Sequence, residues 1–177
     1  MKRRRWYHAA FWSGLYLLLA LAPLAVVFAG PLPPERGFWA EFGAGLGFVA
    51  LAMLALQFVL TARFRGVAAP YGLDTILQFH RQAGLAAVAF ALLHPVFLII
   101  SDPRYIEFLD PRIMFPRAAA LIALSVAMLL IVFLTLWRKR LKLPYEWWRL
   151  THGLLSVFVV LTALVHVLRV EYYISTT

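Results

Sequence analysis

The sequence predicts an all-α integral membrane protein, a bundle of about five transmembrane helices in which two helices each carry a pair of histidines. Three observations predict this class. Hydrophobic residues make up 63% of the 177 residues, and only 14% are charged, whereas soluble domains are about 45–50% apolar and roughly 25% charged. Mean hydropathy is +0.81. Long apolar runs recur along the chain, so lipid is the predicted solvent for most of it.

Five segments are long and apolar enough to cross the ~30 Å hydrocarbon core, which takes about 20 helical residues. These segments are Ala9–Phe28, Phe38–Leu60, Leu73–Ile100, Arg117–Trp137 and Trp147–Val170. The connections combine proline with charge, as in GPLPPERG and RKRLKLPYE, and such stretches end helices. The first segment follows MKRRR and also has features of a cleaved signal peptide. Its apolar run is longer than the usual 7–15 residues of such a peptide, so we expect a retained helix.

Lysines and arginines are unevenly divided between the two ends of the predicted bundle. One end has eleven, namely Lys2, Arg3, Arg4, Arg5, Arg63, Arg65, Arg138, Lys139, Arg140, Lys142 and Arg149. The other end has five, namely Arg36, Arg104, Arg112, Arg117 and Arg169. The positive-inside rule then predicts a cytoplasmic N-terminus in the plasma (inner) membrane. The net charge of +9 follows from these loops, so we expect lipid and no nucleic acid as a partner.

Histidine is the main candidate for redox or metal chemistry, because the chain contains no cysteine. That excludes disulfides, thiolate metal sites, iron–sulfur clusters and Cys-anchored c-type haem. His80 and His94 are 14 residues apart, and so are His152 and His166. Fourteen helical residues advance about 1400°, about 40° short of four turns, and rise about 21 Å. Each pair therefore lies on nearly one face of its helix, at two depths.

The third and fifth segments run in the same direction, so His80 is predicted at the depth of His152 and His94 at the depth of His166. Facing helices would then present two transverse imidazole pairs. Small residues follow the same faces: Gly84, Ala87, Ala91, Ser156, Val159 and Ala163. Such residues often mean close helix packing, but here we expect them to make room for a flat macrocycle.

Two b-type haems, each held by two histidines, account best for this pattern. Zinc sites favour three or four convergent ligands, and proton relays use carboxylates, which the middles of the segments lack. The alternative for each histidine is an ordinary buried side chain bonded to a neighbouring carbonyl. Six-coordinate iron without an open position favours electron transfer over ligand activation.

Arginines close to these histidines are candidates to pair with haem propionates. Arg81 and Arg149 would serve the inner haem, and Arg169 or Arg104 the outer one. An interfacial or loop arginine is the alternative for each. His8 precedes the first segment among basic residues, so we expect an interfacial side chain there, not a ligand.

Two runs, YGLDTILQFHRQAGLAAVAFALLHPVFLI and WWRLTHGLLSVFVVLTALVHVLR, resemble the ferric reductase-like transmembrane domain of ferric and cupric reductases, NADPH oxidases and bacterial flavocytochromes. The resemblance rests on the HR, LLHP, W-R-x-x-H and HV patterns and covers residues 71–170. It implies electron flow from cytoplasmic NAD(P)H through FAD to an inner haem, then an outer haem, then an acceptor outside. Transferred by position, His80 and His152 would ligate the inner haem, and His94 and His166 the outer one.

Two departures from the family pattern matter. Relatives usually continue with a further helix and with FAD- and NAD(P)H-binding domains, whereas this sequence has no G-x-G-x-x-G fingerprint and no soluble dehydrogenase domain. We therefore expect residues 1–177 to be a transmembrane haem domain with its sixth helix missing, either a fragment or a haem subunit served by a cytoplasmic flavoprotein. Oxygen-reducing relatives carry another histidine where this chain has Leu98, which counts against superoxide production.

Three functions stay open. The leading one is a component of an oxidoreductase of the ferric reductase or NADPH oxidase type. The second is the haem membrane subunit of a periplasmic reductase system, as for methionine sulfoxide reductases, supplied by quinol or a flavin partner. The third is a cofactor-free transporter or assembly factor, which predicts a colourless protein and is disfavoured by the lack of intramembrane acids.

Overall fold

The computed structural model describes residues 2–62, 72–170 and 172–173. In chain order its helices are α1 (Lys2–Ala29), α2 (Phe38–Thr61), α4 (Leu73–Ser101), the 3₁₀ helix η1 (Pro103–Leu109), α5 (Pro111–Trp137) and α6 (Tyr145–Val170). The described residues form no strand, and all five α-helices contain a stretch long and apolar enough to span a membrane. The predicted fold class is therefore confirmed, and the chain is a multi-pass membrane protein.

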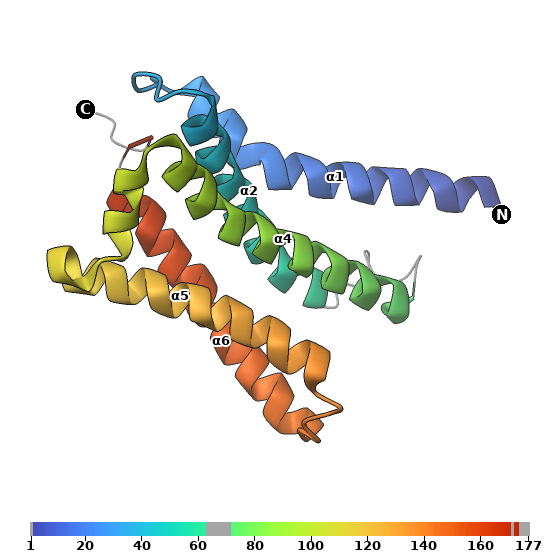
Figure 1. Cartoon of the computed structure of the whole chain (residues 1–177). Coiled ribbons are helices and arrows are strands. Elements are labelled where there is room, and N and C mark those ends of the chain that lie inside the picture. Colours follow the sequence, from blue (N-terminus) through green and yellow to red (C-terminus); the bar gives the residue numbers. More distant parts are fainter. Residues whose placement is uncertain (1, 63–71, 171, 174–177) are drawn as a thin grey trace.

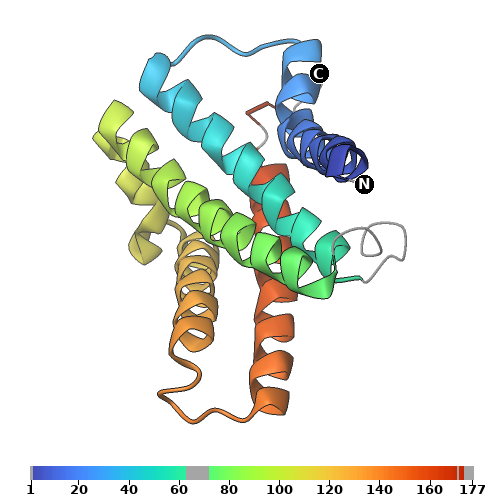
Figure 2. The ribbon, with the colours of Figure 1, turned by 90° about the vertical axis from the view of Figure 1, so that its right-hand side faces the viewer.

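Helices adjacent in the sequence pack against each other in this bundle (Figures 1 and 2). α2 and α4 lie side by side in opposite directions, and α5 packs against α6. α1 packs on α2 and reaches α4 through Tyr16, whose ring meets Phe79 edge-on with 4.9 Å between centroids. Ala20 of α1 is only 3% exposed. The first helix thus contributes to the packed interior.

Small residues of α4 let it approach α2 closely. Ala87 is fully buried in a cluster with Ala20, Met53 and Ala83. A Cβ atom built on Gly84 would lie 3.7 Å from the side-chain oxygen of Gln57 on α2. Gly84 and Ala87 therefore serve helix packing, the role that small residues commonly have in membranes, and the expectation that they make room for a macrocycle is wrong.

The same correction applies in part to α6. Val159, 1% exposed, packs against Leu124, Ala127 and Met128 of α5, and Ser156 donates a hydrogen bond to a carbonyl of its own helix. Ala91 of α4 and Ala163 of α6 pack against the same cluster, and they also border a cavity.

The connection between α4 and α5 is shaped by two Asp-Pro-Arg sequences. Asp102 caps η1 and Asp110 caps α5, each accepting a hydrogen bond from the backbone N–H two residues further on, over 3.0 and 2.8 Å. The prolines that follow occupy the first helical turn, where no N–H is required. η1 lies between the end of α4 and the start of α5 at one end of the bundle, and it packs against both helices (Figure 1).

We name the two ends of the bundle by their histidines. The His94 end includes the α1–α2 connection, η1 and the described residues after α6, and the His80 end includes the start of α4 and of α6. Arg63 and Arg65, which contributed to the predicted charge asymmetry, lie outside the described residues, and so does the side chain of His8. Which end faces the cytoplasm stays a prediction.

Candidate functional site

Two pairs of histidines face each other between α4 and α6. The ring centroids of His80 and His152 are 6.3 Å apart, and those of His94 and His166 are 6.5 Å apart. The backbones of α4 and α6 hardly approach each other within 8 Å, so the imidazoles project into the space between these helices. The structure therefore brings together the partners that equal depth predicted.

These separations fit two imidazoles that share one metal ion. Conjugated C–N bonds of about 1.33 Å place each ring nitrogen about 1.1 Å from the centre of a five-membered ring. A metal–imidazole bond is about 2.0–2.1 Å long. Two imidazoles on opposite sides of one ion would thus have centroids about 6.3 Å apart, close to both observed values.

His94 is fixed by the backbone of α2. Its Nδ1 lies 2.8 Å from the carbonyl oxygen of Gly43, which can only accept, so Nδ1 carries the proton and donates. The neutral ring then keeps its lone pair on Nε2, the atom available to a metal. A Cβ atom on Gly47 would lie 2.9 Å from Nδ1 of His94. Glycine at this position therefore allows α2 to lie directly against the imidazole.

His152 contacts polar and aromatic groups of α5 and α6. Its Nδ1 lies 3.4 Å from the hydroxyl of Thr135, which also accepts a hydrogen bond of 3.4 Å from the indole of Trp148. The Trp148 ring packs on the imidazole, with centroids 5.3 Å apart. His80 differs, because its Nδ1 is buried and has no hydrogen-bond partner among the described residues. An ordinary buried histidine would have such a partner.

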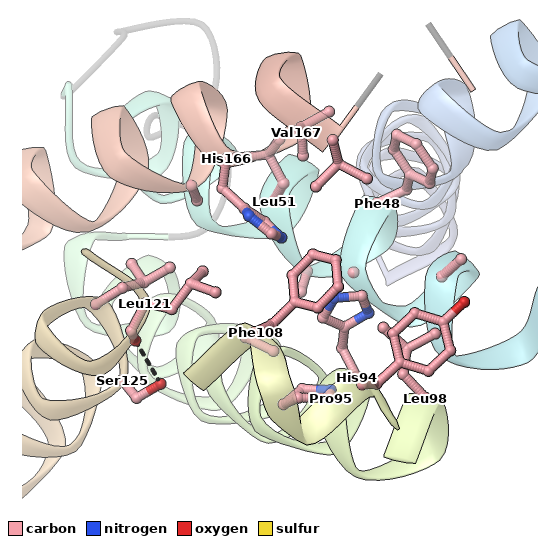
Figure 3. A pocket seen from close by; sticks show the side chains of 18 of the residues that line it. Phe48, Leu51, His94, Pro95, Leu98, Phe108, Leu121, Ser125, His166 and Val167 are labelled. Carbon is pink, nitrogen blue, oxygen red and sulfur yellow. Dashed lines mark hydrogen bonds between the residues drawn. The ribbon is translucent and has the colours of Figure 1, made fainter. Parts of the chain in front are cut away.

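A cavity of about 220 Å³ opens beside the second pair (Figure 3). His94 and His166 enter it from α4 and α6, and Leu121 and Ser125 border it from α5. Ala91 and Ala163, which also pack against the cluster around Val159, line it too. Leu98 stands in the wall where oxygen-reducing relatives were expected to carry a histidine. The lining of the cavity is predominantly apolar, which suits a flat hydrophobic ligand.

Arg36 closes this cavity at the His94 end. Its guanidinium donates to the hydroxyl of Tyr105 over 3.2 Å and to that of Tyr173 over 2.5 Å. It also lies 3.9 Å from the ring centroid of Tyr172. Burial acts to lower the pKa of Arg36, but Tyr173 and Tyr105 outweigh it and raise this pKa above its ordinary value. Arg36 also forms an ion pair with Glu41 over 3.4 Å, so a guanidinium that is already paired with one carboxylate lies at the cavity wall.

Sequence reasoning missed Arg36 as a site residue, because its role depends on segments far away in the chain. The arginines predicted for the outer propionates lie elsewhere. Arg104 forms an ion pair with Asp102 over 2.7 Å and its side chain is 83% exposed, and Arg169 is exposed and absent from the cavity wall. For the inner pair, Arg81 is exposed, and Arg149 forms an exposed ion pair with Glu146 over 3.1 Å.

Among the described residues, no group of three or more His, Cys, Asp or Glu side chains converges on a point where a metal ion could bind. Zinc in proteins normally has three or four such ligands. The donor set present, two facing imidazoles at each of two depths, instead suits a metal whose remaining ligands come from a macrocycle.

Comparison with known proteins assigns most of the chain to one membrane protein family. Residues 46–163 match the family described as ferric reductase like transmembrane component. This match includes His80, His94 and His152 and ends three residues before His166. An uncharacterised protein of Archaeoglobus fulgidus is 30% identical over 129 residues, which cover 68% of this chain and 69% of that relative. No solved structure matches the chain.

Proposed function

Because the chain belongs to the ferric reductase-like transmembrane family, we propose that it transfers electrons across a membrane through two b-type haems. His80 and His152 would hold the inner haem, and His94 and His166 the outer one. The observation that carries the proposal is the geometry of the two pairs, whose centroid separations of 6.3 and 6.5 Å fit two imidazoles that would share one metal ion.

Haem bound at both sites would supply one-electron carriers at two depths of the bilayer. The chain's own residues would prepare each site for it. The Gly43 carbonyl holds the proton of His94 on Nδ1, which leaves Nε2 free and raises the basicity of the ring. The apolar wall of the cavity would exclude water. The positive charge of Arg36 would stabilise a propionate in place of the arginines that sequence reasoning selected.

The direction of transfer follows from the charge asymmetry. With the eleven basic residues in the cytoplasm, the His80 end would accept electrons there and the His94 end would deliver them outside. A cytoplasmic flavoprotein, binding FAD and NAD(P)H, would be the donor. This arrangement would make the chain an oxidoreductase component of the plasma membrane.

The full chain purified in detergent from a haem-replete host tests the proposal. We expect oxidised and dithionite-reduced spectra of low-spin b-type haem, with two haems per polypeptide. His94→Ala and His166→Ala should each retain one haem, whereas His8→Ala, a histidine outside the pairs, should retain both. A colourless wild-type protein would overturn electron transfer and favour the cofactor-free transporter or assembly factor.

A further inference from the structure

α2 and α4 are paired in a register that relates the two histidines of α4 to two positions on α2. Gly43 of α2 faces His94, with a Cβ atom on Gly43 lying 3.2 Å from the carbonyl oxygen of His94. The helices run antiparallel, so a step of 14 residues forward along α2 corresponds to a step of 14 residues backward along α4. Fourteen residues after Gly43 is Gln57, which therefore faces the turn of α4 that contains His80.

The contact of Gln57 with α4 agrees with this register. Its side-chain Oε1 would lie 3.7 Å from a Cβ atom on Gly84, which is one turn after His80. Gln57 is 9% exposed, and among the described residues it is the polar residue that is classed as buried. A buried amide in a membrane helix normally satisfies its hydrogen-bonding groups within the protein.

Only half of the Gln57 amide is satisfied. Its Nε2 donates to the carbonyl of Met53 over 3.3 Å, which identifies the other atom as the oxygen. This Oε1 is buried and has no partner among the described residues, and the same is true of Nδ1 of His80. One is an acceptor, and the other is the ring nitrogen that must donate if Nε2 binds a metal. The two unpaired groups are therefore complementary.

We propose that Gln57 is the positioning residue of His80, with Oε1 accepting a hydrogen bond from one bridging water that in turn accepts the Nδ1–H of the imidazole. It would do for His80 what the Gly43 carbonyl does for His94. Tyr16 packs against the cluster of Met53 and Ala83, and its hydroxyl is also buried without a partner among the described residues, so it is a candidate third group for such a water. The inference rests on the proposed function and deepens it.

Such a bond has a defined effect on the inner site. A hydrogen bond to Nδ1–H raises the basicity of a metal-bound histidine and fixes its ring orientation. A more basic axial ligand favours ferric iron, which lowers the reduction potential of the haem that it ligates. Gln57 would thus lower the potential of the inner haem and leave the outer one unaffected.

Redox titration of Gln57→Leu in the full chain, monitored by visible and EPR spectra, tests the inference. We expect two haems per chain, an altered low-spin EPR signal for one of them, and one of the two reduction steps favoured about tenfold, an increase of about 59 mV for one electron. Gln57→Glu keeps an oxygen that can accept a hydrogen bond in either protonation state. The reduction potential of the inner haem in this variant should therefore equal or fall below that in the wild type. Within the described residues, the Thr61 hydroxyl bonds carbonyls of its own helix, so Thr61→Val should change neither reduction step.

The outcomes separate the inference from the proposed function. Two haems with unchanged potentials in Gln57→Leu would overturn the role of Gln57 and leave the haem proposal intact. Wild-type protein without haem would overturn both. If Gln57→Leu does not fold, Gln57→Glu decides, because a rise in its potential contradicts the inference and an equal or lower value supports it.

Discussion

Arg36 and Tyr173 are joined across 137 positions of the chain by a hydrogen bond of 2.5 Å from the guanidinium to the phenol oxygen. The hydroxyl of Tyr173 in turn donates to the carboxylate of Glu41 at the start of α2, and Arg36 also reaches Tyr105 in η1. Three connections that are remote in sequence thus meet over the cavity between His94 and His166. This network seals the apolar site with polar groups that satisfy one another.

Replacing Arg36 should weaken this end of the bundle. Arg36→Ala removes the side-chain hydrogen bonds to Glu41, Tyr105 and Tyr173. A hydrogen bond to a charged group contributes roughly 1.5–3 kcal/mol, so we expect stability to fall by about 3 kcal/mol or more. The midpoint of thermal unfolding in detergent measures this, and haem content measures the effect on the outer site. Arg104→Ala, which removes an exposed ion pair, is the matched control and should change little. Equal effects of the two variants would contradict the assigned role.

Tyr173 should make stability depend on pH in the alkaline range. Its burial, and next its hydrogen bond to Glu41, raise its pKa to about 12 from an unfolded value of about 10. Since the folded pKa is the higher one, the neutral phenol stabilises the fold fully below pH 10, and this contribution is lost as the pH rises through about 12. Unfolding midpoints between about pH 9 and 12 should fall more steeply for the wild type than for Tyr173→Phe. Parallel curves would contradict the prediction.

Gly47 should be required for the position of His94. An added Cβ atom would lie 2.9 Å from Nδ1 of the imidazole, so Gly47→Ala forces the ring or α2 to move. We expect loss of the outer haem while the inner haem remains, measured as haem per chain. Gly45→Ala on the same helix is the control, because its Cβ atom would meet only Leu24 at 3.9 Å. It should retain both haems and gain slightly in helix stability.

Double variants should reveal which histidines share one haem. His80→Ala combined with His152→Ala removes two ligands of one site, so haem content should equal that of either single variant. His80→Ala combined with His94→Ala removes a ligand from each site and should leave almost no haem. Additive losses within a facing pair would contradict the pairing indicated by the ring separations.

The spans and the histidine spacing could be predicted because both depend on local properties. Apolar runs of about 20 residues bounded by proline and charge define membrane helices without knowledge of their neighbours. The predicted second and third segments begin at Phe38 and Leu73, as α2 and α4 do. α1 begins earlier than predicted, at Lys2, because helix starts among polar residues leave a weak signal. α5 also begins earlier, at Pro111, but its backbone is not helical at Met114, so the uninterrupted helix starts close to the predicted Arg117.

The length of the apolar runs thus accounts for the membrane class and the five spans, and the rise of a helix per residue accounts for the equal depths of the histidines; all three can be read from the amino-acid sequence. Helix packing, in contrast, sets which side of each helix meets which neighbour. It turned Gly84 and Ala87 toward α2 and brought Gly43 to His94 and Arg36 to Tyr173. These contacts depend on the rotation and register of packed helices, and helical periodicity alone leaves that rotation and register open.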